Sequence, residues 1–255
     1  MAAKASTSDD LDKSESEICK EFSVKIFKPR TSTSSPRPKG ITVFLPGTLL
    51  KLESYQSTYQ VLTNEDHLGQ LVVGFTSMNP FPIIGRSHTQ MAKDVATVVQ
   101  ELRRIYHSVA EYQHLSQSKY NIVGHSLGGK VALMVAAKYD IDNVHTIIAL
   151  DPVDDRPQEL TYPKPPQSPT TDLSNSNASA IHLFQSDHAD LNGWFPPLVP
   201  PTKNASVIQS MYPRQISSLT VNKGAGHMSY LDTRSDDASV RARTDVQEKI
   251  RASIQ

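Results

Sequence analysis

Cysteine is almost absent from this 255-residue chain, which contains only Cys19. An internal disulfide is therefore excluded, and this favours a reducing compartment. The chain also lacks an excess of either charge, because Lys and Arg together number 26 and so do Asp and Glu. Without a basic surplus no chain-wide positive field would hold nucleic acid, so we expect no nucleic-acid partner.

Long apolar runs are missing as well. No run approaches the roughly 20 residues that cross a bilayer, and the N-terminal stretch MAAKASTSDDLDKSESE lacks the apolar core of a secretory signal. We therefore expect an intracellular protein without a transmembrane segment. The polar composition of residues 1–22 predicts a disordered tail, although the first residues also resemble a plastid transit peptide.

The rest of the chain predicts a single α/β domain over residues 23–255. Short apolar runs typical of strands alternate with longer segments of helical period. Strands are expected at 23–29, 41–47, 70–79, 120–125, 145–151, 180–186 and 215–223, and helices at 54–67, 88–106, 127–139 and 236–254. This alternation predicts a mostly parallel sheet with helices on both faces.

Proline gathers in two connections that follow strands. Ten of the seventeen prolines lie between Pro152 and Pro201, within predicted loops at 152–179 and 193–214. Both loops belong at the carboxyl edge of the sheet, where the ligands of open α/β sheets bind. We therefore expect them to border a site.

A glycine-rich turn joins the predicted strand at 120–125 to the following helix. Its five residues, Gly-His-Ser-Leu-Gly at 124–128, fit the G-x-S-x-G pattern of a nucleophile elbow. In such an elbow, small residues let backbone segments approach closely, and the serine is exposed in a strained turn at a helix N-terminus. The pattern predicts that Ser126 is a catalytic nucleophile.

A serine hydroxyl needs a base, and the base needs an acid that orients it. In α/β hydrolases these residues follow the chain order Ser, acid, His. His227 follows the last predicted strand in the flexible segment KGAGHMSYLD, so we predict that it is the base, with His188 as the alternative. The acid has two candidates, Asp151 and Asp187, which end neighbouring strands at the same sheet edge.

An oxyanion hole needs two backbone N–H donors. Leu127, directly after the predicted nucleophile, supplies one of them. The other is expected in the loop after the early strand ITVFLPG, where Thr48 is the first choice and Leu49 the second.

Several of these motifs occur together in one family. The segments GHSLGGK, LDPV, FPPLVPP and GHMSYLD stand in the order and at about the spacing seen in chlorophyllases, and FLPGTLLKLESYQSTYQVL is similar to their oxyanion segment. Over residues 23–232 the chain thus resembles the chlorophyllase family of the α/β-hydrolase superfamily. The resemblance implies an α/β-hydrolase fold with Ser126, Asp151 and His227 as the triad. It also implies hydrolysis of the phytyl ester of chlorophyll to chlorophyllide and phytol through an acyl-enzyme, without a metal or other cofactor.

The chain departs from this family at several positions. Leu127 stands where the plant enzymes have arginine, Pro46 stands where they have histidine, and Asp187 occupies the acid position of many other hydrolases. Because GHSLGG is also a common lipase elbow, a general lipase or carboxylesterase is the alternative. An inactive hydrolase fold that serves as a binding protein is a third hypothesis, and the complete Ser/Asp/His set argues against it.

A chlorophyllase and a general lipase or carboxylesterase would both act on a hydrophobic ester, so we expect such an ester as the small-molecule partner. Leu49, Trp194 and Phe195 are the predicted substrate-binding residues. If the ester is chlorophyll, the resemblance further implies a plastid-associated enzyme that makes transient contact with a membrane surface.

Overall fold

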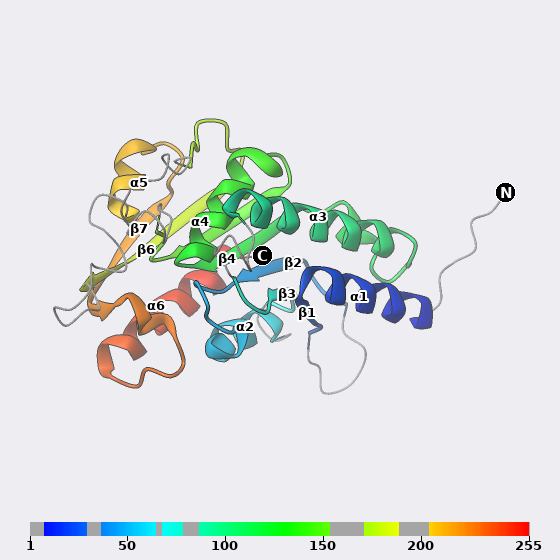
Figure 1. The fold of residues 1–255 in the computed structure, drawn as a ribbon, viewed down its shortest axis with the longest axis horizontal. Coiled ribbons are helices and arrows are strands. Elements are labelled where there is room, and N and C mark those ends of the chain that lie inside the picture. Colours follow the sequence, from blue (N-terminus) through cyan, green and yellow to red (C-terminus); the bar gives the residue numbers. More distant parts are fainter. Residues whose placement is uncertain are drawn as a thin grey trace.

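The computed structural model describes residues 8–29, 37–64, 68–78, 87–153, 171–188 and 204–254. In these ranges a seven-stranded sheet has helices on both faces (Figure 1). The strands are β1 (Val24–Phe27), β2 (Ile41–Leu45), β3 (Leu71–Phe75), β4 (Tyr120–His125), β5 (Val144–Leu150), β6 (Ala180–His188) and β7 (Ser218–Gly226). The α-helices are α1 (Ser8–Phe22), α2 (Gln56–Thr63), α3 (His88–His107), α4 (Leu127–Met134), α5 (Ala205–Met211) and α6 (Asp237–Ser253).

The sheet order is β1-β3-β2-β4-β5-β6-β7. Every neighbouring pair is parallel except β1 and β3, which are antiparallel. The prediction of a mostly parallel sheet is therefore confirmed. Because parallel strands end at one edge, the residues that follow β2, β4, β5 and β6 are brought to the same side of the molecule.

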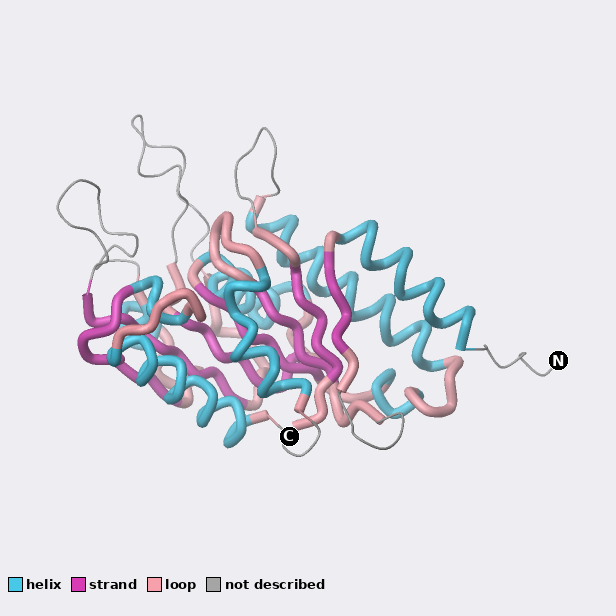
Figure 2. Tube along the Cα trace, turned by 90° about the horizontal axis from the view of Figure 1, so that it is seen from below, coloured by secondary structure: helices cyan, strands magenta, loops and turns pink. Residues whose placement is uncertain are grey.

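The central strands bury apolar side chains on both of their faces. On β2, Val43 joins a cluster that also contains residues of α1, α3 and α4, whereas Phe44 joins a second cluster with residues of α2 and α6. On β4, Ile122 and Val123 divide between the two clusters in the same way. Figure 2 shows the strands between these two helical layers. Burial on both faces explains why the strands read as continuous apolar runs.

The predicted disordered tail is wrong for Ser8–Phe22, which form α1. Leu11 and Ile18 are buried in the cluster that includes α3. Glu15, on the same helix, accepts a hydrogen bond of 2.8 Å from the hydroxyl of Tyr106. The polar composition was misleading because the few apolar residues of this segment recur at helical spacing and so share one buried face.

Other element boundaries also differ from the predictions. The expected helix at 54–67 consists of a short 3₁₀ turn, Leu52–Tyr55, followed by α2, which ends at Thr63. The predicted loop at 193–214 contains α5, whose first turn is capped by the Asn204 side chain accepting from Val207 N–H at 3.1 Å. β7 runs to Gly226 and leads directly into the 3₁₀ turn His227–Tyr230.

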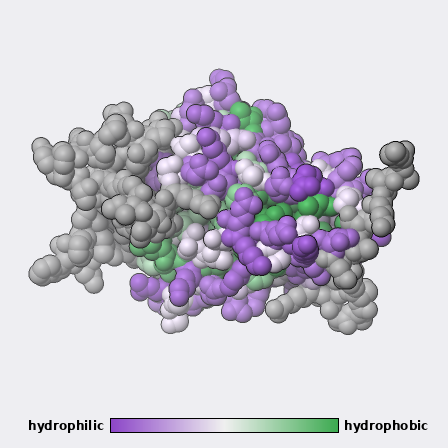
Figure 3. All heavy atoms as spheres, turned by 45° about the vertical axis from the view of Figure 1, so that its right-hand side comes forward, coloured by the Kyte–Doolittle hydropathy of each residue, from purple (hydrophilic) through white to green (hydrophobic). Residues whose placement is uncertain are grey.

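Hydrophilic residues dominate the described surface on the face shown in Figure 3. Among the described residues, the large apolar residues that are exposed to solvent are Leu49, Met211, Val221 and Val240. Across the described ranges, no helix is both long enough and apolar enough to cross a bilayer.

Candidate active site

Ser126 lies in a tight turn between β4 and α4, as the elbow pattern predicts. Its backbone has φ 54° and ψ −118°, a positive-φ conformation that is strained for a residue with a side chain. The surrounding structure holds this geometry. The N–H of Ser126 donates to the carbonyl of Leu150 at 2.8 Å, and its carbonyl accepts from Lys130 N–H at 3.1 Å.

The elbow glycines are required by close backbone contacts. A Cβ atom on Gly128 would lie 2.3 Å from the carbonyl oxygen of Leu45, and one on Gly124 would lie 2.4 Å from the carbonyl oxygen of Gly128. No side chain fits at such distances, so both positions need glycine. The pattern G-x-S-x-G is thereby explained by the packing of β4, α4 and the end of β2.

Asp151 directly follows β5, and its carboxylate is paired with His227. Oδ2 of Asp151 lies 2.7 Å from Nδ1 of His227, and both side chains are buried. Burial by itself would raise the pKa of the Asp151 carboxyl, but hydrogen bonds from His227 and Ser186 outweigh it, and the pKa lies below its ordinary value. The carboxylate is therefore ionised and accepts a hydrogen bond from Nδ1–H of the imidazole.

Ser186 on β6 completes the environment of this carboxylate. Its N–H donates to Oδ1 of Asp151 at 2.9 Å, and its hydroxyl donates to Oδ2 at 2.5 Å. Sequence reasoning missed Ser186, because no motif marks it. Its position one residue before Asp187, at the carboxyl end of β6, was the only available signal.

Asp187, the alternative acid, is placed differently. Its side chain is exposed, and Oδ2 accepts from the N–H of Gly224 at 3.3 Å. The structure therefore brings Asp151, not Asp187, to the ring of His227. The side chain of His188 and the residues Trp194 and Phe195 lie outside what the structure describes.

The loop after β2 runs beside the elbow. A Cβ atom on Gly47 would lie 3.4 Å from Cβ of Ser126, so this loop passes next to the serine. Leu49 N–H donates to the carbonyl of Met78 at 2.9 Å, which removes it as a free donor. Within the described residues, the N–H groups of Thr48 and Leu127 donate to no protein group.

Leu49 is the most exposed large apolar residue near this loop. The residue is 58% exposed, and its φ of 58° is a second strained backbone angle beside the elbow. This placement is compatible with the predicted contact to an apolar substrate.

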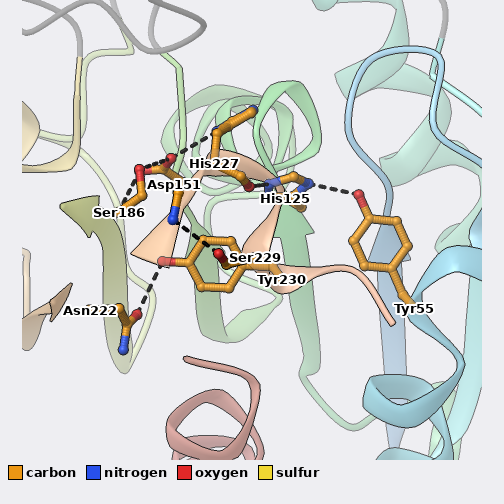
Figure 4. A network of polar contacts seen from close by, with 9 residues as sticks. Tyr55, His125, Asp151, Ser186, Asn222, His227, Ser229 and Tyr230 are labelled. Atoms are coloured by element: carbon orange, nitrogen blue, oxygen red, sulfur yellow. Dashed lines mark hydrogen bonds and ion pairs between the residues drawn. The ribbon is translucent and has the colours of Figure 1, made fainter. Parts of the chain in front are cut away.

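His125 links the elbow to two neighbouring segments (Figure 4). Its Nδ1 lies 2.7 Å from the hydroxyl of Tyr55, and its Nε2 lies 2.9 Å from the backbone carbonyl oxygen of His227. The hydroxyl of Tyr55 also accepts from Gly47 N–H at 3.0 Å. Complete burial, together with the nearby His227, lowers the pKa of His125 to about 3, so this imidazole is neutral.

His227 packs against His125, the residue that precedes Ser126. The rings of His125 and His227 have centroids 4.7 Å apart, and Ser126 is the next residue in the chain. Over the ranges that the structure covers, no hydrogen bond joins Ser126 Oγ to the ring of His227. Catalytic hydrogen bonds are often long before substrate binds. Among the same residues, no group of three or more His, Cys, Asp or Glu side chains could hold a metal ion.

Comparisons with known proteins address the fold. Residues 81–194 match a family model described as alpha/beta hydrolase fold. No curated protein matches the chain. Among solved structures, the chain is similar to Thermogutta terrifontis esterase 2 phosphonylated by cyclosarin, with a TM-score of 0.61 and 14% identity over 89% of this chain and 87% of that one.

A second solved structure supports the same fold. Dienelactone hydrolase from Anabaena variabilis ATCC 29413 is similar with a TM-score of 0.55 and 14% identity, over 91% of this chain and 92% of that one. The elbow between β4 and α4 and the mostly parallel sheet agree with these matches. The chain therefore has the alpha/beta hydrolase fold that its sequence predicted.

Proposed function

We propose that this protein is a serine hydrolase that cleaves carboxylic esters. Ser126 is the nucleophile, His227 is the general base, and Asp151 orients and stabilises the imidazole. The observation that carries the proposal is the buried 2.7 Å contact between His227 Nδ1 and the Asp151 carboxylate, and the strained φ of 54° at Ser126 accompanies it. A strained serine, a histidine and a buried acid in the chain order Ser, Asp, His form the parts of a catalytic triad.

The proposed reaction uses the free nitrogen of His227. Because Nδ1 carries a proton toward Asp151, Nε2 is the atom that accepts the proton of Ser126 Oγ. The serine oxygen then attacks the ester carbonyl carbon, and the tetrahedral intermediate expels the alcohol as His227 returns the proton to it. The same nitrogen then deprotonates a water molecule, which attacks the acyl carbon of the acyl-enzyme. The bond to Ser126 Oγ breaks, His227 returns the proton to that oxygen, and the carboxylic acid is released.

The negative oxygen of the tetrahedral intermediate needs donors that are already in place. Thr48 and Leu127 are the proposed donors, since their N–H groups are unengaged within the described ranges. The N-terminus of α4, at which Leu127 lies, adds a favourable dipole.

The proposed substrate is an ester with an apolar portion, in contact with Leu49. The similar structures in the comparisons include an esterase, which favours a general carboxylesterase. The phytyl ester of chlorophyll is the second candidate. It is supported by the resemblance of the segments LDPV and GHMSYLD to chlorophyllases. It is also supported by the contact between Asp151 of the first segment and His227 of the second.

A fluorophosphonate probe tests the chemistry, because it labels only an activated serine. We expect the wild-type protein to be labelled and Ser126→Ala not to be labelled. Folded wild-type protein that remains unlabelled and hydrolyses no ester would contradict the proposal and favour a binding protein. The ratio of kcat/KM for chlorophyll and for a series of p-nitrophenyl esters then decides between the two substrates.

A further inference from the structure

One chain of buried hydrogen bonds connects the three segments on which the proposed mechanism depends. It begins at Gly47 N–H, passes through the hydroxyl of Tyr55 and the ring of His125, and ends at the carbonyl oxygen of His227. Gly47 precedes the proposed oxyanion donor, His125 precedes the proposed nucleophile, and His227 is the proposed base. Tyr55 and His125 are both completely buried.

The two ends of this chain fix the direction of every hydrogen bond in it. The backbone N–H of Gly47 can only donate, and the carbonyl oxygen of His227 can only accept. Nε2 of His125 must therefore carry the ring proton, which leaves Nδ1 as an acceptor. The hydroxyl of Tyr55 must then donate to Nδ1 while it accepts from Gly47. Only the neutral Nε2–H tautomer of His125 satisfies all four groups.

We propose that Tyr55 and His125 are positioning residues. They hold the loop after β2, the nucleophile Ser126 and the base His227 in their positions relative to one another. This inference rests on the proposed function. Each hydrogen bond ties a different loop to the next, so the loss of either side chain frees the β2 loop or the His227 turn to shift relative to Ser126. Displacements on the order of 1 Å at such a site cost about a hundredfold in rate.

The neutrality of His125 also serves the proposed base. His227 becomes an imidazolium during the reaction, and its ring lies 4.7 Å from that of His125. A second positive charge at this distance would oppose the protonation of His227. A neutral ring can occupy this position and still donate a hydrogen bond to the backbone of His227.

Tyr55→Phe tests the proposal, because it removes one oxygen and leaves the ring. We expect kcat per active site to fall about tenfold to a hundredfold, with KM within about twofold of wild type, since positioning acts on the transition state. Active sites are counted by complete reaction with the fluorophosphonate probe, so that unfolded protein does not contribute.

Tyr230→Phe is the matched control. Tyr230 is also fully buried, its ring centroid lies 5.6 Å from that of His125, and its hydroxyl donates to Asn222 Oδ1 at 3.1 Å. Its hydroxyl is outside the chain from Gly47 to His227, so we expect kcat to stay within about twofold of wild type. A kcat that is unchanged in Tyr55→Phe, or lowered equally in both variants, would overturn the proposal.

A double-mutant cycle with His125→Gln tests whether the two residues act through each other. Glutamine can place an N–H near the position of Nε2 but offers no acceptor at the position of Nδ1. We expect the effect of Tyr55→Phe on kcat to be at least about threefold smaller in the His125→Gln background. If the effects of the two substitutions on kcat simply multiply, the residues act independently, and the proposed joint positioning role is overturned.

Failure of the positioning role can be distinguished from failure of the proposed function. If Tyr55→Phe does not fold, His125→Gln alone carries the test, and we expect at least a tenfold loss of kcat with KM unchanged. An unchanged kcat in that variant overturns the inference. If the wild-type protein itself is not labelled by the probe, the proposed function has failed, whereas labelled wild type with an unaffected Tyr55→Phe contradicts only the positioning role.

Discussion

The Nδ1 atom of His227 lies 2.7 Å from Oδ2 of Asp151, although 76 residues separate the two in the sequence. Because the pKa of Asp151 is held below its ordinary value by its hydrogen bonds in spite of burial, this carboxylate fixes the proton of His227 on Nδ1. The other ring nitrogen is thereby left as a proton acceptor. In the proposed mechanism this nitrogen is the atom that accepts the proton of Ser126.

Ser126 and His227 are expected to act as a unit. Ser126→Ala and His227→Ala should each lower kcat about 10⁶-fold, and the double variant should lose little more, since neither residue is effective without the other. Ester hydrolysis by purified variants measures this, with circular dichroism to show that they are folded. Near-normal turnover in a folded Ser126→Ala variant would exclude the serine mechanism.

The two candidate acids should differ strongly. Asp151→Asn should lower kcat by about 10⁴-fold, because an amide no longer fixes the tautomer of His227 or stabilises the imidazolium. Asp187→Asn is the matched control, and it should change kcat by less than about threefold, since an exposed side chain away from His227 contributes little. A severe loss confined to Asp187→Asn would refute the assignment.

Acid should weaken the fold through His125. Its pKa is about 3 in the folded protein and 6.5 as an ordinary histidine, so between these values the unfolded state binds a proton that the folded state does not. The free energy of unfolding then decreases as pH falls, by about 2 kcal/mol between pH 6.5 and pH 5. Urea denaturation of wild type and His125→Gln measures the two slopes. Parallel pH profiles would contradict the prediction.

The elbow should not accept a methyl group at its tightest glycine. In Gly128→Ala the new Cβ would lie 2.3 Å from a backbone oxygen, and relief requires the backbone to move, at a cost of about 3 kcal/mol or more. At Gly129 the nearest atom would be 3.1 Å away, on the side chain of Pro152. Gly129→Ala should therefore destabilise much less, and thermal unfolding of both variants compares them. Equal stability of the Gly128→Ala and Gly129→Ala variants would contradict the prediction that a methyl group at Gly128 cannot be accommodated.

The N-terminal helix α1 should contribute to stability. Leu11 is buried in the apolar cluster that also contains residues of α3 and α4. Leu11→Ala should therefore lower the free energy of unfolding by about 2 to 4 kcal/mol. Ser16→Ala, at an exposed position of the same helix, should change it by less than about 0.5 kcal/mol. Denaturant titration of both variants checks this. No difference between them would mean that the helix is not docked in solution.

Much of the fold could be predicted from local sequence. The strands predicted at 41–47 and 120–125 correspond to β2 and β4 within two residues at each end, because burial on both faces demands continuous apolar side chains. Helix α3 was equally clear, since its apolar residues recur at helical period. The elbow could be recognised because Ser126 and the glycines that its tight turn needs lie within a few residues of one another in the sequence.

Helix α1 was predicted wrongly for a physical reason. Its apolar face consists of a few residues, and its charged residue Glu15 is buried in contact with Tyr106, far along the chain. The composition of a segment averages over all its residues, so it does not show that one charged residue has a distant partner such as Tyr106. The role of Trp194 and Phe195, outside the described residues, stays a prediction.

The sequence by itself determined which kinds of residue would reach the carboxyl edge of the sheet, since Ser126, Asp151, Asp187 and His227 each follow a predicted strand. Only the tertiary structure decided which of them meet. The pairing of Asp151 with His227, the support from Ser186 and the contact of Tyr55 with His125 join separate strands and loops. Such contacts depend on strand order, on register and on backbone angles such as the φ of 44° at Asp151, and those are fixed by the packing of the whole sheet rather than by any short stretch of the chain.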